Sequence, residues 1–259
     1  MMLQWQCLVR RMGAHITKQN AIKRAGLAMP LAMVDVVIFT VAEGGLQVLL
    51  VQRPRDPRDP YPGQWALPGG IVDVVADPDL ESCARRKLTE KTGVASPYLE
   101  QLGSWGNARR DPRGWSATHV YFALIPAVPA LKPGANAVDA RWFTVAGDGV
   151  QPGLAFDHTE ILAVAIARLR AKVEYTSLPA FLLQPEFTLS ELQRAYEIVL
   201  GRDLEKSAFR TRLLAADVVK PLDKIRKGPN RPAQLYRLRN AYEPVFFART
   251  FAPRKGTGR

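Results

Sequence analysis

Cysteine and histidine are both scarce in this chain of 259 residues. There are only two cysteines, Cys7 and Cys83, and three histidines. Two cysteines are too few for a disulfide framework or a cysteine-based zinc site, and this fits the reducing cytoplasm. Cys83 falls within a predicted helix, where we expect a small buried side chain.

Long hydrophobic runs are also missing. The longest apolar runs, such as residues 34–40, are far shorter than the roughly 20 residues that cross a bilayer. Five basic residues interrupt the first 30 positions, so a signal peptide is not expected there. We therefore predict a cytoplasmic protein without a membrane partner. A hydrophobic content of 47% is enough for a sizeable core and, at this length, for two domains.

Acidic residues are outnumbered by basic ones at both ends of the chain. Residues 1–30 contain five Lys/Arg and no acid, residues 31–179 contain 15 against 16, and residues 180–259 contain 16 against 8. The three net charges are therefore +5, −1 and +8. A near-neutral middle joined to a basic C-terminal part is typical of a ligand-binding domain fused to a nucleic-acid-binding domain.

Residues 65–94 are predicted to form a strand end, a double-glycine turn and one helix with a charged stripe. Gly69 and Gly70 allow a close approach of the backbone to a ligand. We expect the unpaired N–H groups at the start of the helix to point toward this turn, an arrangement that suits a phosphate.

This stretch resembles the Nudix box of pyrophosphate hydrolases, and its tail reads RKLTEKTGV at residues 86–94. Arg86 and Glu90 lie four apart and are expected to pair on one helix face. Leu88 and Val94 fill the apolar positions, and Gly93 is expected to end the helix with a left-handed cap.

Two of the three carboxylates of the box are missing. Lys87 and Lys91 stand in their places, and 16 residues separate Gly70 from Arg86 where the box has 14. The upstream glutamate therefore has no clear counterpart, and Asp77, Asp79 and Glu81 are only its neighbours. Magnesium needs carboxylate oxygens, whereas two ammonium groups repel a cation and attract phosphate.

We therefore predict a cavity that binds a nucleotide without cutting it, needs no cofactor and has no catalytic residue. Glu90 is the only box carboxylate that remains, and so it is the one weak candidate for a metal ligand. The alternative is an active hydrolase in which other carboxylates hold Mg²⁺ and the two lysines are ordinary solvated residues.

Further ligand contacts are expected from arginines in two loops. Arg53 begins a proline-rich segment, and Arg109 and Arg113 lie between two tryptophans, a mixture suited to a diphosphate and an adenine. The alternative is a surface loop that Trp115 anchors to the core. His158 is expected to be structural. The predicted ligand-binding set is Arg53, Gly69, Gly70, Arg86, Lys87, Glu90, Lys91, Arg109 and Arg113.

Residues 31–175 alternate strand and helix patterns. A hairpin is predicted from residues 34–40 and 47–51, and further strands at 98–105, 117–125 and 138–145. A closing helix is predicted at 157–172, with Asp157 as its N-cap. This α/β pattern with two long helices predicts a Nudix-type α/β/α sandwich with a mixed sheet.

Residues 176–245 change to a winged helix-turn-helix pattern. Thr188 and Glu191 form a predicted capping box, Gly201 ends that helix, and a second helix follows at 204–215. Strands at 218–219 and 235–238 flank a basic tip at 224–233. The predicted DNA contacts are Lys206, Ser207, Arg210, Arg212, Arg226, Lys227 and Arg231. Residues 1–30 are expected to form a basic, disordered extension and 246–259 a basic tail.

Motifs in both domains resemble the Nudix-related transcriptional regulators of the NrtR type. They include YLEQLGSWGNARRDPRGWS at 98–116, AFDH at 155–158, FTLSELQ at 187–193 and RPAQLY at 231–236. The resemblance implies a homodimeric repressor of genes for NAD metabolism that binds an inverted repeat in double-stranded DNA. It also implies that a nucleotide such as ADP-ribose releases the protein from DNA. We expect the domain junction near residues 172–179 to transmit this change. An active ADP-ribose pyrophosphatase and a sugar-responsive regulator are the alternatives.

Overall fold

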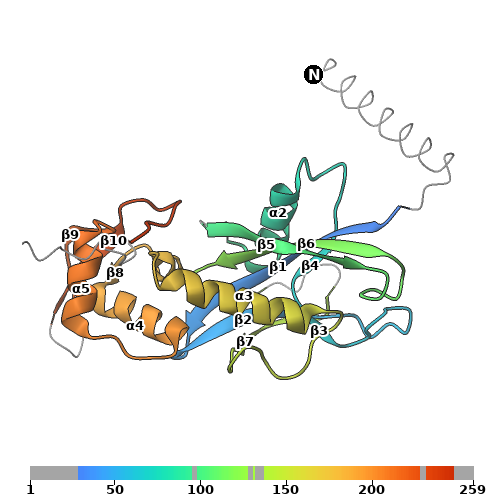
Figure 1. The fold of residues 1–259 in the computed structure, drawn as a ribbon, viewed down its shortest axis with the longest axis horizontal. Coiled ribbons are helices and arrows are strands. Elements are labelled where there is room, and N and C mark those ends of the chain that lie inside the picture. The colour runs from blue at the N-terminus through green and yellow to red at the C-terminus, as the bar shows by residue number, and fades with distance from the viewer. Residues whose placement is uncertain (1–28, 95–97, 128–130, 132–136, 228–231, 248–259) are drawn as a thin grey trace, which may run out of the picture.

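A mixed seven-stranded sheet forms the centre of the first domain (Figure 1). The structure is a computed structural model that describes residues 29–94, 98–127, 131, 137–227 and 232–247. The strands are β1 (Leu31–Ala42), β2 (Gly45–Gln52), β3 (Trp65–Ala66), β4 (Gly69–Ile71), β5 (Tyr98–Asn107), β6 (Ser116–Leu124) and β7 (Asp139–Thr144). Their order is β3-β2-β1-β6-β5, with β4 paired to β1 and β7 to β2. Only the β1/β6 pair is parallel among these strands, so the sheet is mixed as predicted.

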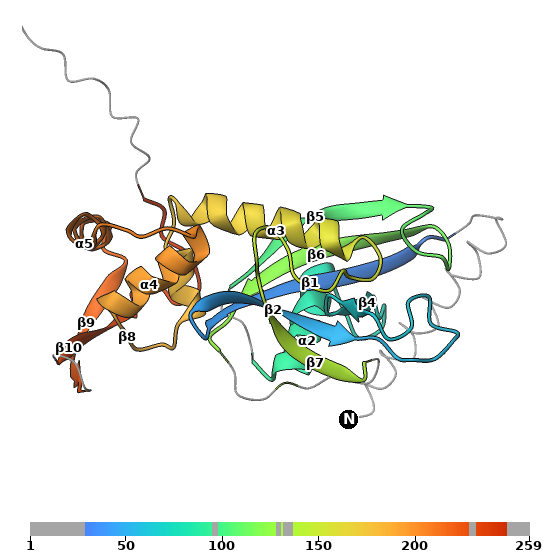
Figure 2. The ribbon, with the colours of Figure 1, turned by 90° about the horizontal axis from the view of Figure 1, so that it is seen from below.

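Strand β1 is buried on both faces because each face of the sheet carries a helix. Val36 and Ile38 belong to the core on one side, and Val37 and Phe39 belong to the core on the other. Helix α2 (Leu80–Thr92) covers the first face and α3 (His158–Val173) covers the second (Figure 2). The predicted α/β/α sandwich is therefore confirmed. No helix in the described ranges is long and apolar enough to span a bilayer.

The double glycine does not lead directly into α2. Gly69 and Gly70 lie in the short strand β4, and residues 72–79 separate that strand from the helix. The side chain of Asp79 caps the helix by accepting from the backbone N–H of Ser82. The predicted left-handed cap at Gly93 is confirmed, with φ of 70°.

The second domain has the two predicted helices followed by the two predicted strands, and a 3₁₀ helix and a short strand that were not predicted precede them. It consists of the 3₁₀ helix η1 (Leu178–Leu182), β8 (Phe187–Thr188), α4 (Leu189–Leu200), α5 (Lys206–Ala215), β9 (Val219–Arg226) and β10 (Ala233–Leu238). The capping box of Thr188 and Glu191 and the left-handed cap at Gly201 are confirmed. Helix α5 begins two residues later than predicted because Glu205 caps it. Strand β9 continues through Arg226, which therefore lies in a strand and not in a loop tip.

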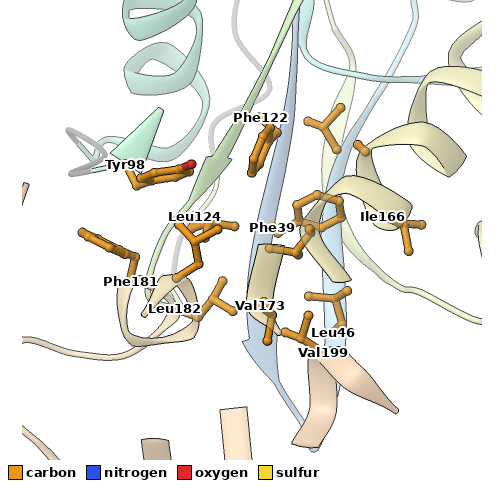
Figure 3. Packing of buried hydrophobic residues seen from close by; sticks show 14 of the residues in the cluster. Phe39, Leu46, Tyr98, Phe122, Leu124, Ile166, Val173, Phe181, Leu182 and Val199 are labelled. Atoms are coloured by element: carbon orange, nitrogen blue, oxygen red, sulfur yellow. The ribbon is translucent and has the colours of Figure 1, made fainter. Parts of the chain in front are cut away.

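One hydrophobic core extends from the first domain into the second. It contains Phe39 and Phe122 of the sheet, Ile166 and Val173 of α3, and Val199 of α4. Figure 3 shows Val173 and Val199 next to each other at the end of this cluster. The end of α3 is thus packed against the winged helix.

Candidate functional site

A cavity of about 380 Å³ lies where β1, β3, β4, α2 and the start of α3 meet. Six residues of the predicted ligand-binding set line it: Arg53, Gly69, Gly70, Lys87, Lys91 and Arg113. Five cationic side chains and two carboxylates are among the lining residues, so the cavity carries a net positive charge. Such a field favours an anionic ligand.

Lys87 and Lys91 place two ammonium groups at this cavity from one face of α2. Both residues are buried, and no hydrogen bond or ion pair joins Lys87 to any residue within the described ranges. A Cβ atom on Gly70 would lie 3.2 Å from the Lys87 Nζ, and Gly70 has φ of 147°. Burial lowers the pKa of Lys91; the charge of Glu90 partly opposes this shift, and the charge of Lys87 adds to it.

Three predicted ligand residues lie away from the cavity lining. Arg86 holds Asp77 through two hydrogen bonds of 2.7 and 2.6 Å and also pairs with Glu90 at 2.8 Å. The predicted Arg86–Glu90 pair is therefore confirmed, but it faces solvent and loop 72–79 and not the cavity. Arg109 is exposed, whereas its neighbour Arg110 is buried and lines the cavity.

The start of helix α2 is also absent from the cavity lining, contrary to the predicted phosphate site at its N-terminus. Residues 79–82 do not line the cavity. Asp79 already accepts from one of the free N–H groups of this helix end. Lys87, in the middle of the helix, occupies the position next to Gly70 instead.

Arg110 and Asp157 form an ion pair between the arginine-rich loop and α3. The guanidinium of Arg110 donates through Nε and Nη2 to the two carboxylate oxygens of Asp157, each at 2.8 Å. Asp157 stands at the N-cap position of α3, but its side chain makes no capping hydrogen bond. The predicted N-cap position is therefore confirmed, but the carboxylate does not cap the helix because it is directed to a cation far away in the sequence.

Asp35 and His158 form a second buried pair in the cavity wall. The N–H of Leu67 donates to His158 Nδ1 at 3.0 Å, which leaves Nε2 to carry the proton 3.5 Å from Asp35. Burial raises the pKa of Asp35. The combined effect of His158, Thr118 and Arg110 lowers it by more, so the pKa is below its ordinary value. One feature of the sequence indicates this buried pair: Asp35 is a charged residue within a largely apolar strand.

Gly69 is needed because of this buried carboxylate. A Cβ atom at this position would lie 1.9 Å from Asp35 Oδ1 and 2.7 Å from the backbone oxygen of Val34. Both distances are below any normal contact, so only glycine lets β4 pair with β1 here.

The cavity residues do not fit a magnesium ion. Neither of its two carboxylates is free: Asp59 pairs with Arg53 at 2.7 Å, and Asp35 lies 3.5 Å from His158 Nε2 and 3.9 Å from Arg110. Glu90 is exposed and does not line the cavity. Within the described part of the chain, no cluster of three or more His, Cys, Asp or Glu residues could hold a metal ion. Hard cations need oxygen ligands that are free to coordinate, and this cavity offers ammonium groups instead.

The predicted DNA-binding residues lie on or near α5 and the wing, in different environments. Lys206, Ser207 and Lys227 are exposed. Arg212 donates to the backbone oxygen of Glu174 at 3.0 Å and lies over the ring of Phe247.

The remaining arginines predicted to bind DNA are Arg210, Arg226 and Arg231. Arg210 is partly buried. Arg226 pairs with Glu191 and donates to the backbone oxygen of Glu186. Arg231 lies outside the described residues.

Comparison with known proteins gives a family for this architecture. The NUDIX domain family matches residues 31–163, and the family of the NrtR DNA-binding winged helix domain matches residues 179–238. The ADPR responsive transcriptional repressor NtrR of Acinetobacter baylyi is 50% identical over 208 residues, which is 80% of this chain and 82% of that protein. The chain belongs to the NrtR family.

Solved NrtR structures share this arrangement of domains. Shewanella oneidensis NrtR is 41% identical with a TM-score of 0.76, and the match covers 85% of this chain and 99% of that one. The same protein in complex with a 27mer DNA is 40% identical with a TM-score of 0.76, over 84% and 98% of the two chains. The NUDIX domain of that NrtR, complexed with ADP ribose, is 43% identical with a TM-score of 0.50, over 56% and 92%.

Proposed function

We propose that this NrtR family member is a transcriptional repressor that binds double-stranded DNA through its winged helix and is released by ADP-ribose bound in the cavity. The observation that carries the proposal is the pair Lys87 and Lys91, which place positive charge where a Nudix hydrolase needs carboxylates. The DNA complex and the ADP-ribose complex of the Shewanella relative support the two partners.

The cavity can bind a pyrophosphate through charge-assisted hydrogen bonds. Lys87 has no competing protein partner in the described residues, and Lys91 lies one helical turn away on the same face. Arg53 and Arg113 extend the positive wall, although each already holds an aspartate. Phe156, with the Arg53 guanidinium 4.8 Å from its ring centroid, adds an aromatic surface beside them.

We propose that the bound nucleotide is not cleaved. Hydrolysis in Nudix enzymes relies on a metal ion to polarise the pyrophosphate and to prepare a water, and the residues present do not fit that ion. The cavity then acts as a sensor whose output is a change in DNA affinity.

Helix α3 is the proposed connection between the cavity and the DNA-binding helix. Its first residue, His158, lines the cavity, and Figures 1 and 2 show the helix running along the sheet toward α4 and α5. Just beyond its last turn, Glu174 pairs with Arg202 at 2.9 Å and accepts from Arg212 of α5 through its backbone oxygen. A ligand that shifts the start of α3 therefore acts on a rigid element whose C-cap residue, Glu174, is bonded to α5.

We further propose that the protein is a homodimer that controls genes for NAD metabolism. A two-fold symmetric dimer binds an inverted repeat whose half-sites are about one helical turn, or a multiple of it, apart. A repressor that senses ADP-ribose would couple transcription to the breakdown products of NAD.

The decisive experiment measures DNA binding and hydrolysis with the same full-length protein. We expect a fluorescent duplex from the region upstream of its own gene to bind, and ADP-ribose, but not ribose 5-phosphate, to release it. We also expect no AMP from ADP-ribose in the presence of Mg²⁺. Rapid metal-dependent release of AMP without retention of any duplex would instead identify an ADP-ribose pyrophosphatase. Release by a sugar phosphate alone would identify a sugar-responsive regulator.

A further inference from the structure

The outward face of α5 is formed by uncharged side chains. Ser207, Thr211 and Leu214 are separated by four and three residues, so they lie on one stripe of the helix. All three are exposed, and Leu214 retains 51% of its surface whereas its neighbour Leu213 retains 1%. The opposite stripe carries the buried Leu213 and the partly buried Phe209, whose ring centroid lies 5.1 Å from that of Tyr196.

The arginines of α5 lie on the flanks of this outward face. Arg212 is held toward α3 by its hydrogen bond to the Glu174 backbone oxygen, and its guanidinium lies 5.0 Å from the ring of Phe247. Arg210 is partly buried, and its Nε is enclosed without a hydrogen-bond partner among the described residues. The flanks of a recognition helix approach the two phosphate backbones of the groove, while its outermost stripe approaches the base edges.

On bound DNA, the exposed apolar side chain of Leu214 favours an apolar partner. A phosphate group has no apolar surface for the leucine to contact. In the major groove, the apolar group on a base edge is the C5-methyl group of thymine. The hydroxyl groups of Ser207 and Thr211 can both donate to and accept from base edges. Together these three side chains match a short half-site that contains thymine.

We propose that Ser207, Thr211 and Leu214 are the base-reading residues of α5, with Leu214 against a thymine methyl group, and that the arginines contact phosphates only. This assignment rests on the proposed function, because it requires the winged helix to bind DNA. It narrows the predicted DNA contacts of Arg210 and Arg212 to the phosphate backbone.

The test replaces thymine by uracil, which removes only the methyl group. The full chain first selects its preferred duplexes from a random pool, and each dT of the selected half-site is then replaced by dU, one at a time. For the unmodified protein we expect at least one replacement per half-site to weaken binding about fourfold, the effect of one buried methyl group. For Leu214→Ala we expect the same replacement to have no effect.

Matched variants make the result specific to this helix face. Val164→Ala removes an exposed apolar side chain from α3 and is expected to keep the full response to uracil. Thr211→Ala is expected to relax the selected sequence, whereas Arg210→Ala is expected to weaken all duplexes equally.

Two results overturn the assignment. One is an unchanged uracil effect in Leu214→Ala, and the other is loss of sequence preference in Arg210→Ala with none lost in Thr211→Ala. Both leave the proposed function standing, because the protein still selects DNA. If no duplex is enriched from the pool, the proposed function fails as well.

Discussion

Lys87 and Lys91 show how two side chains on one helix face decide what a cavity can hold. The surrounding frame is that of a pyrophosphate-binding fold, with Gly70 next to the Lys87 ammonium and Leu88 packed in the core. At these two positions the hydrolase pattern has carboxylates, so the sign of the charge on this helix face is reversed. A cavity that would hold a metal ion and a substrate is thereby suited to bind the anion directly.

Replacing Lys87 by glutamine should weaken ADP-ribose binding about 10- to 100-fold, because a charge-assisted hydrogen bond contributes about 1.5–3 kcal/mol. Isothermal titration calorimetry measures this change. The matched control is Arg109→Gln, which removes an exposed charge from a neighbouring loop and should leave the affinity unchanged. Equal losses in both variants would mean that only the general field of the protein attracts the ligand.

Asp77 is a buried carboxylate that is stabilised mainly by the guanidinium of Arg86. The hydrogen bonds from Arg86 hold the pKa of Asp77 well below its ordinary value, more than offsetting the effect of burial. Because the pKa of the folded state is depressed, the stabilisation is fully present above the ordinary carboxyl pKa and is lost as the pH falls through the folded-state value.

The substitution Asp77→Asn should therefore lower the free energy of unfolding at pH 7 by about 1–3 kcal/mol, since it leaves part of the Arg86 guanidinium without its partner. The difference from the unmodified protein should shrink as the pH falls below the ordinary carboxyl pKa. Urea denaturation at pH 7 and pH 3 measures both effects. Asp223→Asn, at an exposed wing position, should show neither, and a constant difference at both pH values would contradict the assignment.

At the scale of elements, local capping determines where the helices of the winged helix begin and end. Thr188 and Glu191 exchange side-chain and backbone hydrogen bonds at the start of α4, and Gly201 ends the helix in the left-handed conformation. These signals act within one turn of the chain, which is why the sequence predicted them correctly.

Replacing Thr188 by alanine should destabilise the protein by about 1 kcal/mol because one N–H group at the start of α4 loses its acceptor. Thermal and urea unfolding of the full chain measure the loss. Thr188→Ser keeps the hydroxyl and should recover most of it. If serine were as destabilising as alanine, the buried methyl group of Thr188, and not the cap, would explain the effect.

At the scale of the whole molecule, the core links both domains, and α3 spans the distance between the cavity and α5. Reciprocity then requires that DNA raises the Kd for ADP-ribose by the same factor by which ADP-ribose raises the Kd for DNA. A coupling free energy of about 1–3 kcal/mol corresponds to roughly a 5- to 150-fold change.

Arg212→Ala should reduce this factor toward one because it removes the bond between α5 and the end of α3. The measurement is the Kd for ADP-ribose with and without saturating DNA. Arg237→Ala, an exposed cation on β10, serves as the control and should keep the factor unchanged. If Arg212→Ala lowered DNA affinity but preserved the factor, α3 would not carry the coupling through this bond.

The sequence by itself determined the α-helices, the longer strands of the sheet, the two-domain order and the charge exchange at positions 87 and 91. These features depend on periodicity, capping and spacing within one helix, where residues four apart share a face. The Arg86–Glu90 pair and the caps at Gly93 and Gly201 belong to the same class of local features.

Only the tertiary structure decided which side chains from distant segments meet. It brought Arg110, and not the adjacent Arg109, to the cavity, directed Asp157 to Arg110 and placed Asp35 beside His158. Neighbouring residues in a loop have equal local preferences, so their directions depend on partners far away in the sequence. The physical reason is that a buried charge is stable only when packing supplies a counter-charge or a hydrogen bond, and that partner exists only once the chain has folded.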